Sequence, residues 1–135
     1  MKIESGELKE LLDFTVRLAR EAGEIIQGYY QRSCAAERKR DGSFVTAADR
    51  EAESHLRRAI EASFPADWIL GEEEGERAGT SPRRWIIDPL DGTYSFVHGV
   101  PLFGVLVGLE ADGETMLGVV NLPALNELVY AARGL

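Results

Sequence analysis

The sequence predicts an α+β fold in which two amphipathic helices pack on a mainly antiparallel sheet. Helical periodicity dominates the first half of the chain, and short apolar segments separated by turn residues follow in the second half. Two helices followed by an antiparallel meander define the α+β class. With 135 residues, 44% of them hydrophobic, the chain is sufficient for one domain with a real core.

Two helices are expected before Pro65. In residues 7–30, apolar side chains recur every three or four positions with charged residues between them, which is typical of one amphipathic helix. The second helix is expected to begin at Thr46, because Thr46 and Asp49 have the spacing of a capping box, with Asp in place of the usual Glu. Pro65 stops this helix. Residues 40–43 are expected to form a turn between the two helices.

Five short strands are expected after Pro65, each apolar and bounded by turn residues. They cover residues 68–70, 85–87, 102–110, 116–122 and 128–132. Residues 111–114, Ala-Asp-Gly-Glu, predict a hairpin connection between two of them. Residues 76–84 predict the one mobile loop of the chain.

The strand over residues 102–110 has two unlike faces. Alternation places four apolar residues on one face: Phe103, Val105, Val107 and Leu109. The other face carries Gly104 and Gly108, on either side of Leu106. Because glycine allows another backbone to approach closely, this pattern predicts that an element packs over the sheet at the glycines.

Composition excludes several classes of function. The formal charge of −8 argues against nucleic-acid binding, which needs clustered Lys and Arg, and the basic residues 38–40 are interpreted as a solvated loop. The single cysteine, Cys34, excludes an internal disulfide framework, fits a reducing compartment and lacks the context of a nucleophile. No apolar run approaches the ~20 residues that span a bilayer, and the first residues lack a signal-peptide core. We therefore expect a cytoplasmic protein with no nucleic-acid or membrane partner.

The string Trp85-Ile-Ile-Asp-Pro-Leu-Asp-Gly-Thr93 places two aspartates directly after an expected strand. Asp88 leaves the strand at its carboxyl end, and Asp91 follows one turn later, at the start of an expected helical segment over residues 93–98. Two carboxylates ~4 Å apart repel by about 4 kcal/mol at an effective dielectric constant of ~20, so the pair must separate, bind a proton or hold a cation. A hard divalent cation with oxygen ligands is the natural bridge, and the Leu90 carbonyl can supply a further oxygen.

Ordinary turn chemistry offers an alternative for the same residues. Asp91 can be a helix N-cap, and Asp-Gly is a common turn pair.

Gly92 and Thr93 also present free N–H groups at a helix N-terminus, where a phosphate oxygen is favoured. A second acidic segment favours the metal site, because three glutamates at residues 72–74 follow the strand over residues 68–70. Such a charge run is usually a solvated loop.

The motifs that carry these acids closely resemble the inositol monophosphatase family of magnesium-dependent phosphomonoesterases. The resemblance rests on Gly71-Glu-Glu73, Trp85-Ile-Ile-Asp-Pro-Leu-Asp-Gly-Thr93, Phe96-Val-His-Gly-Val-Pro101 and Val45-Thr-Ala-Ala-Asp49. It covers essentially the whole chain. Residues 99–103 and 118–125 are more similar to the branch of histidinol-phosphate phosphatases than to the animal inositol enzymes.

The resemblance implies a set of ligands for magnesium ions. Glu72 and Asp88 would bind the metal, with Asp88 bridging two Mg²⁺ ions. The Leu90 carbonyl would complete the first site, and Asp91 would bind the second ion.

The resemblance also implies the groups that act on the substrate. Thr93, oriented by Asp49, would position or deprotonate the attacking water, and Glu73 would support the metal ligands. Gly92 and Thr93 would hold the substrate phosphate. The cations would lower the pKa of the water and neutralise charge on the phosphoryl oxygens during in-line displacement. Asp49 has an equally good ordinary interpretation as the third residue of its capping box.

Three other residues have no implied part in the chemistry of the metal ions. His55 and His98 lack partners at metal-binding spacing and are expected to be structural or exposed. Tyr94 is expected to line the entrance for the substrate.

Full members of the family continue into a second domain with a W-D-x-A-A-type motif, and no Trp-Asp pair occurs in this sequence. We therefore expect residues 1–135 to be a single amino-terminal metal-binding domain of a layered sugar-phosphatase-like fold, with the carboxy-terminal domain absent. The expected function is magnesium-dependent hydrolysis of a small phosphorylated metabolite, inositol phosphate or histidinol phosphate, by activated water. The alternative is a non-catalytic cation-binding domain that associates through its exposed sheet edge, as a homodimer or with a complementing half.

Overall fold

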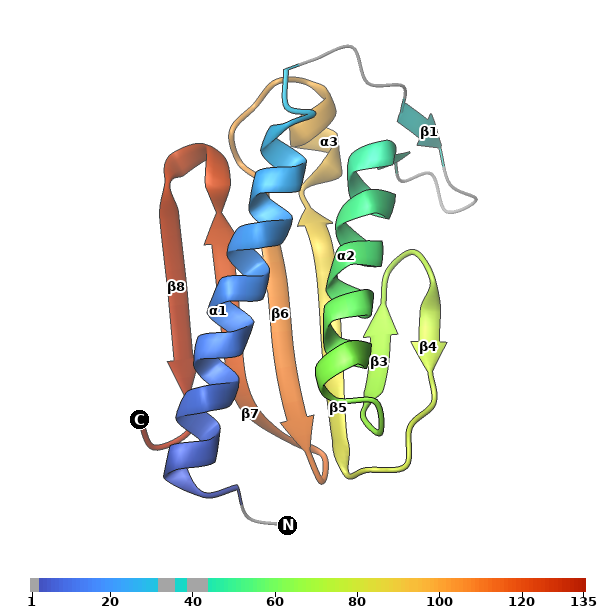
Figure 1. The fold of residues 1–135 in the computed structure, drawn as a ribbon. Helices are drawn as coiled ribbons and strands as arrows, with labels where there is room; N and C mark the ends of the chain where they lie inside the picture. The colour runs from blue at the N-terminus through green and yellow to red at the C-terminus, as the bar shows by residue number, and fades with distance from the viewer. Residues whose placement is uncertain (1–2, 32–35, 39–43) are drawn as a thin grey trace.

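Two long helices lie side by side on one face of a six-stranded sheet in the computed structural model, which describes residues 3–31, 36–38 and 44–135 (Figure 1). The helices are α1 (Ser5–Gln27), α2 (Ala47–Ser63) and the short α3 (Thr93–Val97), with a 3₁₀ turn η1 (Pro123–Leu125). The large sheet has the order β4-β3-β5-β6-β7-β8. Its strands are β3 (Trp68–Gly71), β4 (Gly75–Arg77), β5 (Arg83–Asp91), β6 (Gly104–Ala111), β7 (Glu114–Leu122) and β8 (Glu127–Ala132). The predicted α+β class is confirmed.

A small two-stranded sheet, which the sequence did not predict, precedes α2. It consists of β1 (Ala36–Arg38) and β2 (Phe44–Thr46), paired antiparallel. The predicted turn at residues 40–43, the basic residues Lys39 and Arg40, and Cys34 lie outside the described residues. Among the helices that are described, none is long and apolar enough to cross a membrane.

The two predicted long helices are confirmed, with one correction at the end of the first. Helix α1 ends at Gln27 rather than at residue 30, and the chain turns away at Gln31, whose φ of 59° is left-handed. Tyr30 leaves the helical path because its ring packs against Phe96 and Phe103, and its hydroxyl donates a 2.8 Å hydrogen bond to the Gly99 carbonyl.

The predicted capping box begins α2. The Thr46 backbone N–H donates to Asp49 Oδ2 at 2.7 Å, and the Asp49 N–H lies 3.4 Å from the Thr46 hydroxyl. Both groups are buried, so the amino-terminal end of α2 is held firmly against the sheet.

The sheet is antiparallel except for one pair of strands. Strands β3 and β5 run parallel, with Gly71 opposite Ile87, because the chain reverses direction twice between them through β4. The expected antiparallel meander is therefore wrong at this pair. Strand β4 was not predicted, because Gly75–Arg77 has no apolar alternation.

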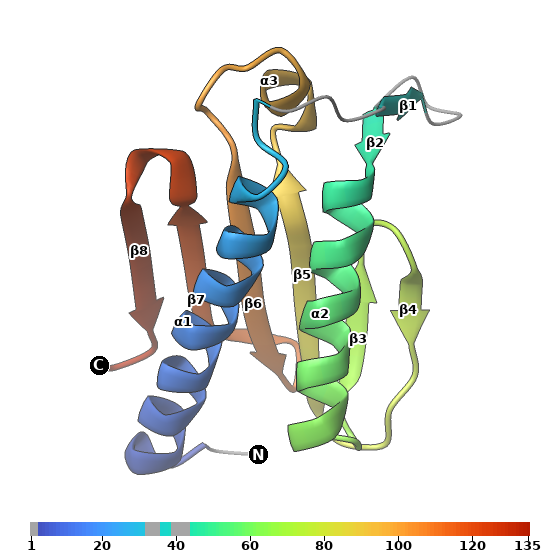
Figure 2. The same ribbon diagram turned by 45° about the horizontal axis from the view of Figure 1, so that its top comes forward.

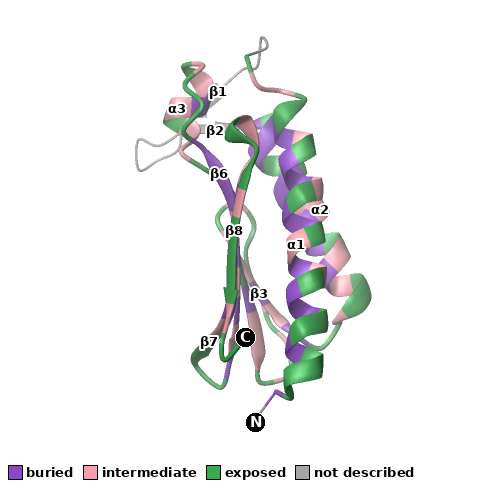
Figure 3. Ribbon diagram, turned by 90° about the vertical axis from the view of Figure 1, so that its left-hand side faces the viewer, coloured by how far each residue is buried: buried purple, intermediate pink, exposed green. Residues whose placement is uncertain are grey.

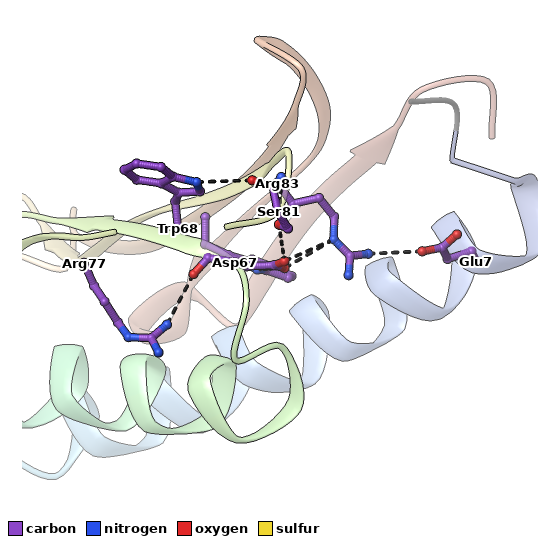
Figure 4. A network of polar contacts seen from close by, with 7 residues as sticks. Glu7, Asp67, Trp68, Arg77, Ser81 and Arg83 are labelled. Atoms are coloured by element: carbon purple, nitrogen blue, oxygen red, sulfur yellow. Dashed lines mark hydrogen bonds and ion pairs between the residues drawn. The ribbon is translucent and has the colours of Figure 1, made fainter. Parts of the chain in front are cut away.

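The segment over residues 76–84 is not the loop that the sequence predicted. Its ends belong to β4 and β5, and its middle is bound to the residues that follow α2. Asp67, only 1% exposed, accepts a hydrogen bond from the Ser81 hydroxyl at 2.6 Å and pairs with the Arg83 guanidinium at 3.3 Å (Figure 4). It also accepts a bond from the indole N–H of buried Trp85 at 3.0 Å. These contacts fix the return of the chain from β4 to β5.

The hydrophobic core lies between the two helices and one face of the sheet (Figure 3). Trp85, Val107 and Val119 point into it and are at most 2% exposed. The opposite face of the sheet is open in the described part of the chain, where Val120 is 37% and Val129 is 64% exposed.

The prediction that an element packs over the glycines of β6 is wrong for the described residues. A Cβ atom added at Gly108 would meet only the Leu117 carbonyl, at 3.8 Å. At Gly104 it would approach the Leu122 side chain to 2.8 Å, so this glycine makes room for the neighbouring strand β7.

Replacing Asp67 tests the contacts that fix the segment between β4 and β5. In Asp67→Ala, the indole N–H of Trp85 and the guanidinium of Arg83 lose a buried acceptor, so we expect the free energy of unfolding to fall by about 3 kcal/mol. Urea denaturation measures this loss. Asp13→Ala is the control, because Asp13 is 67% exposed and its ion pair with Lys9 lies on the surface, so a change within about 0.5 kcal/mol is expected. Equal losses in the two variants would contradict the structural importance of Asp67.

Candidate metal centre

The predicted site residues come from three segments that meet at one end of the sheet. The parallel pairing of β3 and β5 brings their carboxyl ends together, so Glu72 follows β3 next to the place where Asp88 continues β5. The amino-terminal end of α2 and helix α3 lie at the same end of the molecule (Figure 2). This arrangement collects Asp49, Glu72 and Asp88 around one region.

A bulge in β5 allows both aspartates to face the same side. Asp88 pairs with Leu106 and Asp91 pairs with Gly104, so β5 carries one residue more than β6 between these points. In a regular strand, residues three apart lie on opposite faces, whereas one inserted residue restores the alternation. Burial agrees with this geometry, because Pro89 and Leu90 are both buried while Asp88 is half-buried and Asp91 is exposed.

The sequence predicted the proximity of the two aspartates but assigned it to a different geometry. Strand β5 continues through Asp91 instead of ending at residue 87, and Gly92 is the N-cap of α3. The alternative interpretation of Asp91 as the helix N-cap is therefore wrong. Gly92 has a φ of 90°, and a Cβ atom there would lie 2.7 Å from the Leu102 carbonyl, so glycine is required on both counts.

The carboxylates act on one another electrostatically. Burial raises the pKa of Asp88 from its ordinary 3.8 to about 6, and the negative charges of Glu72, Asp91 and Asp49 add to the rise, against a hydrogen bond from the Leu90 backbone. Burial and the neighbouring negative charges therefore both oppose ionisation of Asp88. A cation placed there would relieve this repulsion.

The donor atoms suit a hard divalent cation, although they are not gathered into a finished site. Within the described residues, no group of three or more His, Cys, Asp or Glu side chains could hold a metal ion as it stands. Glu72 and Asp91 are exposed at the rim, and only Asp88 lies deeper. The available donors are all oxygens, which is the ligand type that Mg²⁺ prefers. The roles of Glu72, Asp88, Leu90 and Asp91 as ligands stay predictions.

The structure brings Thr93 and Asp49 into contact, as the resemblance implied. The Thr93 hydroxyl lies 3.1 Å from Asp49 Oδ1 and 3.1 Å from the Leu90 carbonyl oxygen, so its single proton can be donated to either. Asp49 uses its other oxygen, Oδ2, to accept hydrogen bonds from the backbone and hydroxyl of Thr46. The two interpretations of Asp49, as capping residue and as partner of Thr93, are therefore compatible.

Glu73 and the turn around it are held from helix α2. The backbone N–H groups of Glu73 and Glu74 donate to the two oxygens of Glu53, at 2.9 and 2.7 Å. Glu53 is fully buried, and the sequence analysis missed it because a glutamate on a helix is usually solvent-exposed. Its only sequence signal is its position one helical turn after Asp49.

The remaining candidates behave as ordinary structural residues. His55 lies 3.0 Å from Glu21 on α1, and His98 stacks on Tyr94 with ring centroids 4.3 Å apart. The expectation that both histidines are structural or exposed is confirmed. Tyr94 is 66% exposed, and its place at a substrate entrance stays a prediction.

Comparison with known proteins identifies the class of protein. The model described as "Inositol monophosphatase family" matches residues 7–135. A histidinol-phosphatase of Chlorobaculum parvum is 50% identical over 124 residues, which are 91% of this chain and 48% of that protein. A fructose-1,6-bisphosphatase/inositol-1-monophosphatase of Thermotoga maritima is 41% identical over 124 residues, again 91% of this chain and 48% of that protein.

A solved structure supports the same assignment. The IMPase of Thermotoga maritima superposes with a TM-score of 0.86 at 40% identity and covers 93% of this chain and 49% of that chain. The chain therefore belongs to the inositol monophosphatase family, as the sequence motifs predicted. It spans about half the length of the curated relatives it matches.

The raised pKa of Asp88 predicts a pH-dependent cost to stability when no metal is present. The folded protein binds the Asp88 proton more tightly than the unfolded chain, so this residue's contribution to stability falls as the pH rises from 3.8 to about 6. At pH 7 in EDTA, we expect Asp88→Asn to be more stable than the unaltered chain by about 1 kcal/mol, allowing for solvent screening. Near pH 3.5 the difference should disappear.

Urea denaturation at the two pH values measures both free energies of unfolding. Asp112→Asn, in the exposed turn after β6, is the matched control and should show no such pH-dependent gain. A gain for Asp88→Asn that is equal at both pH values would contradict the raised pKa of Asp88.

Proposed function

We propose that this protein serves in the magnesium-dependent hydrolysis of a small phosphate monoester. The carrying observation is that Glu72, Asp91 and Asp49 lie close enough to Asp88 to raise its pKa, and that Asp49 also accepts a hydrogen bond from the Thr93 hydroxyl. Carboxylates that repel one another at the end of a sheet form a site that a divalent cation would stabilise. The family that the chain belongs to supports the reaction class.

Some residues of this chain would bind the metal ion, and others would orient the attacking water and the phosphate. Glu72, Asp88, Asp91 and the Leu90 carbonyl would hold Mg²⁺, which when bound supplies charge neutralisation for the phosphoryl oxygens and acidifies water. Thr93 would orient the attacking water through its hydroxyl oxygen, which can accept a hydrogen bond from water while the hydroxyl donates to Asp49 or to the Leu90 carbonyl. Gly92 and Thr93 would hold a phosphate oxygen through their backbone N–H groups, and Glu73 would support the ligands beside it.

The substrate class follows from the relatives. The relative with 50% identity bears the name histidinol-phosphatase, and the one with 41% identity bears the name of an inositol monophosphatase and fructose bisphosphatase. We propose a small phosphorylated metabolite, with histidinol phosphate tested beside inositol phosphate. Action in the cytoplasm stays a prediction from the single cysteine.

A second candidate is a cation-binding domain without catalysis of its own. One observation favours it: within the described residues, β8 is an edge strand with Val129 64% and Tyr130 56% exposed. An exposed edge of this kind can pair with a second copy of the chain or with a complementing polypeptide.

Phosphate release distinguishes the two candidates. With Mg²⁺ present, we expect release from histidinol phosphate or inositol phosphate, and a loss of roughly 100-fold in kcat/KM in Asp91→Asn, because a metal ligand supports several kcal/mol of charge stabilisation. Asp112→Asn, at the opposite end of the sheet, is the matched control and should retain activity.

Each other outcome has a definite meaning. Equal release by the Asp91→Asn variant and the unaltered chain would exclude the catalytic assignment. Heat of Mg²⁺ binding in calorimetry without phosphate release would favour the second candidate. Absence of both phosphate release and heat of Mg²⁺ binding would contradict a metal site.

A further inference from the structure

The buried residues Glu53 and Arg57 on helix α2 have no role in the proposed reaction. They form hydrogen bonds and an ion pair with the turn that carries Glu72 and Glu73. Glu53 is 0% exposed and Arg57 is 8% exposed. Arg57 Nε lies 3.2 Å from Glu53 Oε2 and 3.2 Å from Glu74 Oε2, and its Nη2 donates to the Gly75 carbonyl. Together with the hydrogen bonds that Glu53 accepts from Glu73 and Glu74, the pair contacts two residues of the turn after β3 and Gly75, the first residue of β4.

A surface turn does not ordinarily require a buried carboxylate. Glu72 and Glu74 are exposed, so water could satisfy the backbone of this turn without any partner from α2. Burying a charged group costs free energy unless it is paired and hydrogen-bonded, and Glu53 meets that condition with two backbone N–H groups and one guanidinium. These contacts hold the turn in one position relative to helix α2.

Helix α2 carries two carboxylates one turn apart, and each holds a different segment of the site. Asp49 contacts Thr93 after the bulge of β5, while Glu53 contacts the turn after β3. Residues four apart on a helix lie on one face at a fixed separation. Helix α2 therefore fixes the position of the Glu72 turn relative to the segment from Asp88 to Thr93.

We infer that Glu53, supported by Arg57, is a positioning residue that sets the approach of Glu72 to Asp88 and thereby the affinity of the site for a divalent cation. The inference rests on the proposed magnesium site. It assigns no contact between Glu53 and the ion, because Glu53 uses both oxygens on the turn.

Isothermal titration with Mg²⁺, on the full chain, tests the inference through binding instead of activity. We expect Glu53→Gln to weaken Mg²⁺ binding at least about 10-fold, since groups that orient metal ligands typically carry effects of this size. Glu61→Gln is the matched control on the same helix, because Glu61 is 41% exposed and its ion pair with Arg77 is remote from the site. It should bind Mg²⁺ as the unaltered chain does.

A second pair of variants disturbs the contact without removing either charge. A Cβ atom at Gly71 would lie 2.8 Å from both Arg57 Nη2 and the Glu53 carboxyl carbon, so Gly71→Ala should displace the pair and weaken binding in the same direction. In Gly118→Ala, the matched control, the added methyl group meets nothing within 4 Å. If Glu53→Gln fails to fold, the comparison of Gly71→Ala with Gly118→Ala tests whether displacement of Glu53 and Arg57 weakens Mg²⁺ binding.

The outcomes separate this inference from the proposed function. A folded Glu53→Gln chain with unchanged Mg²⁺ affinity, and only a lower melting temperature in EDTA, would overturn the inference and leave the proposed function intact. Absence of Mg²⁺ binding by the unaltered chain would contradict the proposed function, and the inference would fall with it.

Discussion

Repulsion among carboxylates at one end of the sheet is the constraint on which the rest of this structure depends. Asp88 lies where burial and three neighbouring negative charges oppose its ionisation. A chain selected for stability alone would have no reason to gather these groups. The surrounding scaffold must hold these carboxylates near one another against their repulsion. Its irregular features help to position them.

Each of these features positions a carboxylate where regular secondary structure alone would not place it. The bulge of β5 turns Asp91 to the side that Asp88 faces, and Gly92 at a φ of 90° lets the chain pass close to Leu102 directly afterwards. Helix α2 adds two buried carboxylates, Asp49 and Glu53, each of which accepts hydrogen bonds at both oxygens. Local irregularity and buried charge, both costly in free energy, are concentrated around the same few residues.

The sequence predicted features that depend on local patterns and missed those that depend on distant contacts. The capping box of Thr46 and Asp49 and the helix faces follow from spacing alone, and the Asp88 and Asp91 pair could be identified from its motif. Strand β4 is short and polar, so only its pairing with β3 defines it. Glu53 carries the sequence signature of a solvated side chain, and its burial follows from where the turn after β3 packs. The glycines of β6 show that a face can accept a close neighbour, but not that the chain contains one.

The single parallel pair in the sheet explains why the site exists at this end of the molecule. Had β3 and β5 been antiparallel neighbours, as in a simple meander, Glu72 and Asp88 would lie at opposite ends of the two strands. Strand β4 prevents this, because its reversal lets the chain return and enter β5 in the direction of β3. The contacts of Asp67 with Ser81, Arg83 and Trp85 secure that return at the far end of the sheet. A buried aspartate remote from the proposed metal ligands thus helps to determine that they meet.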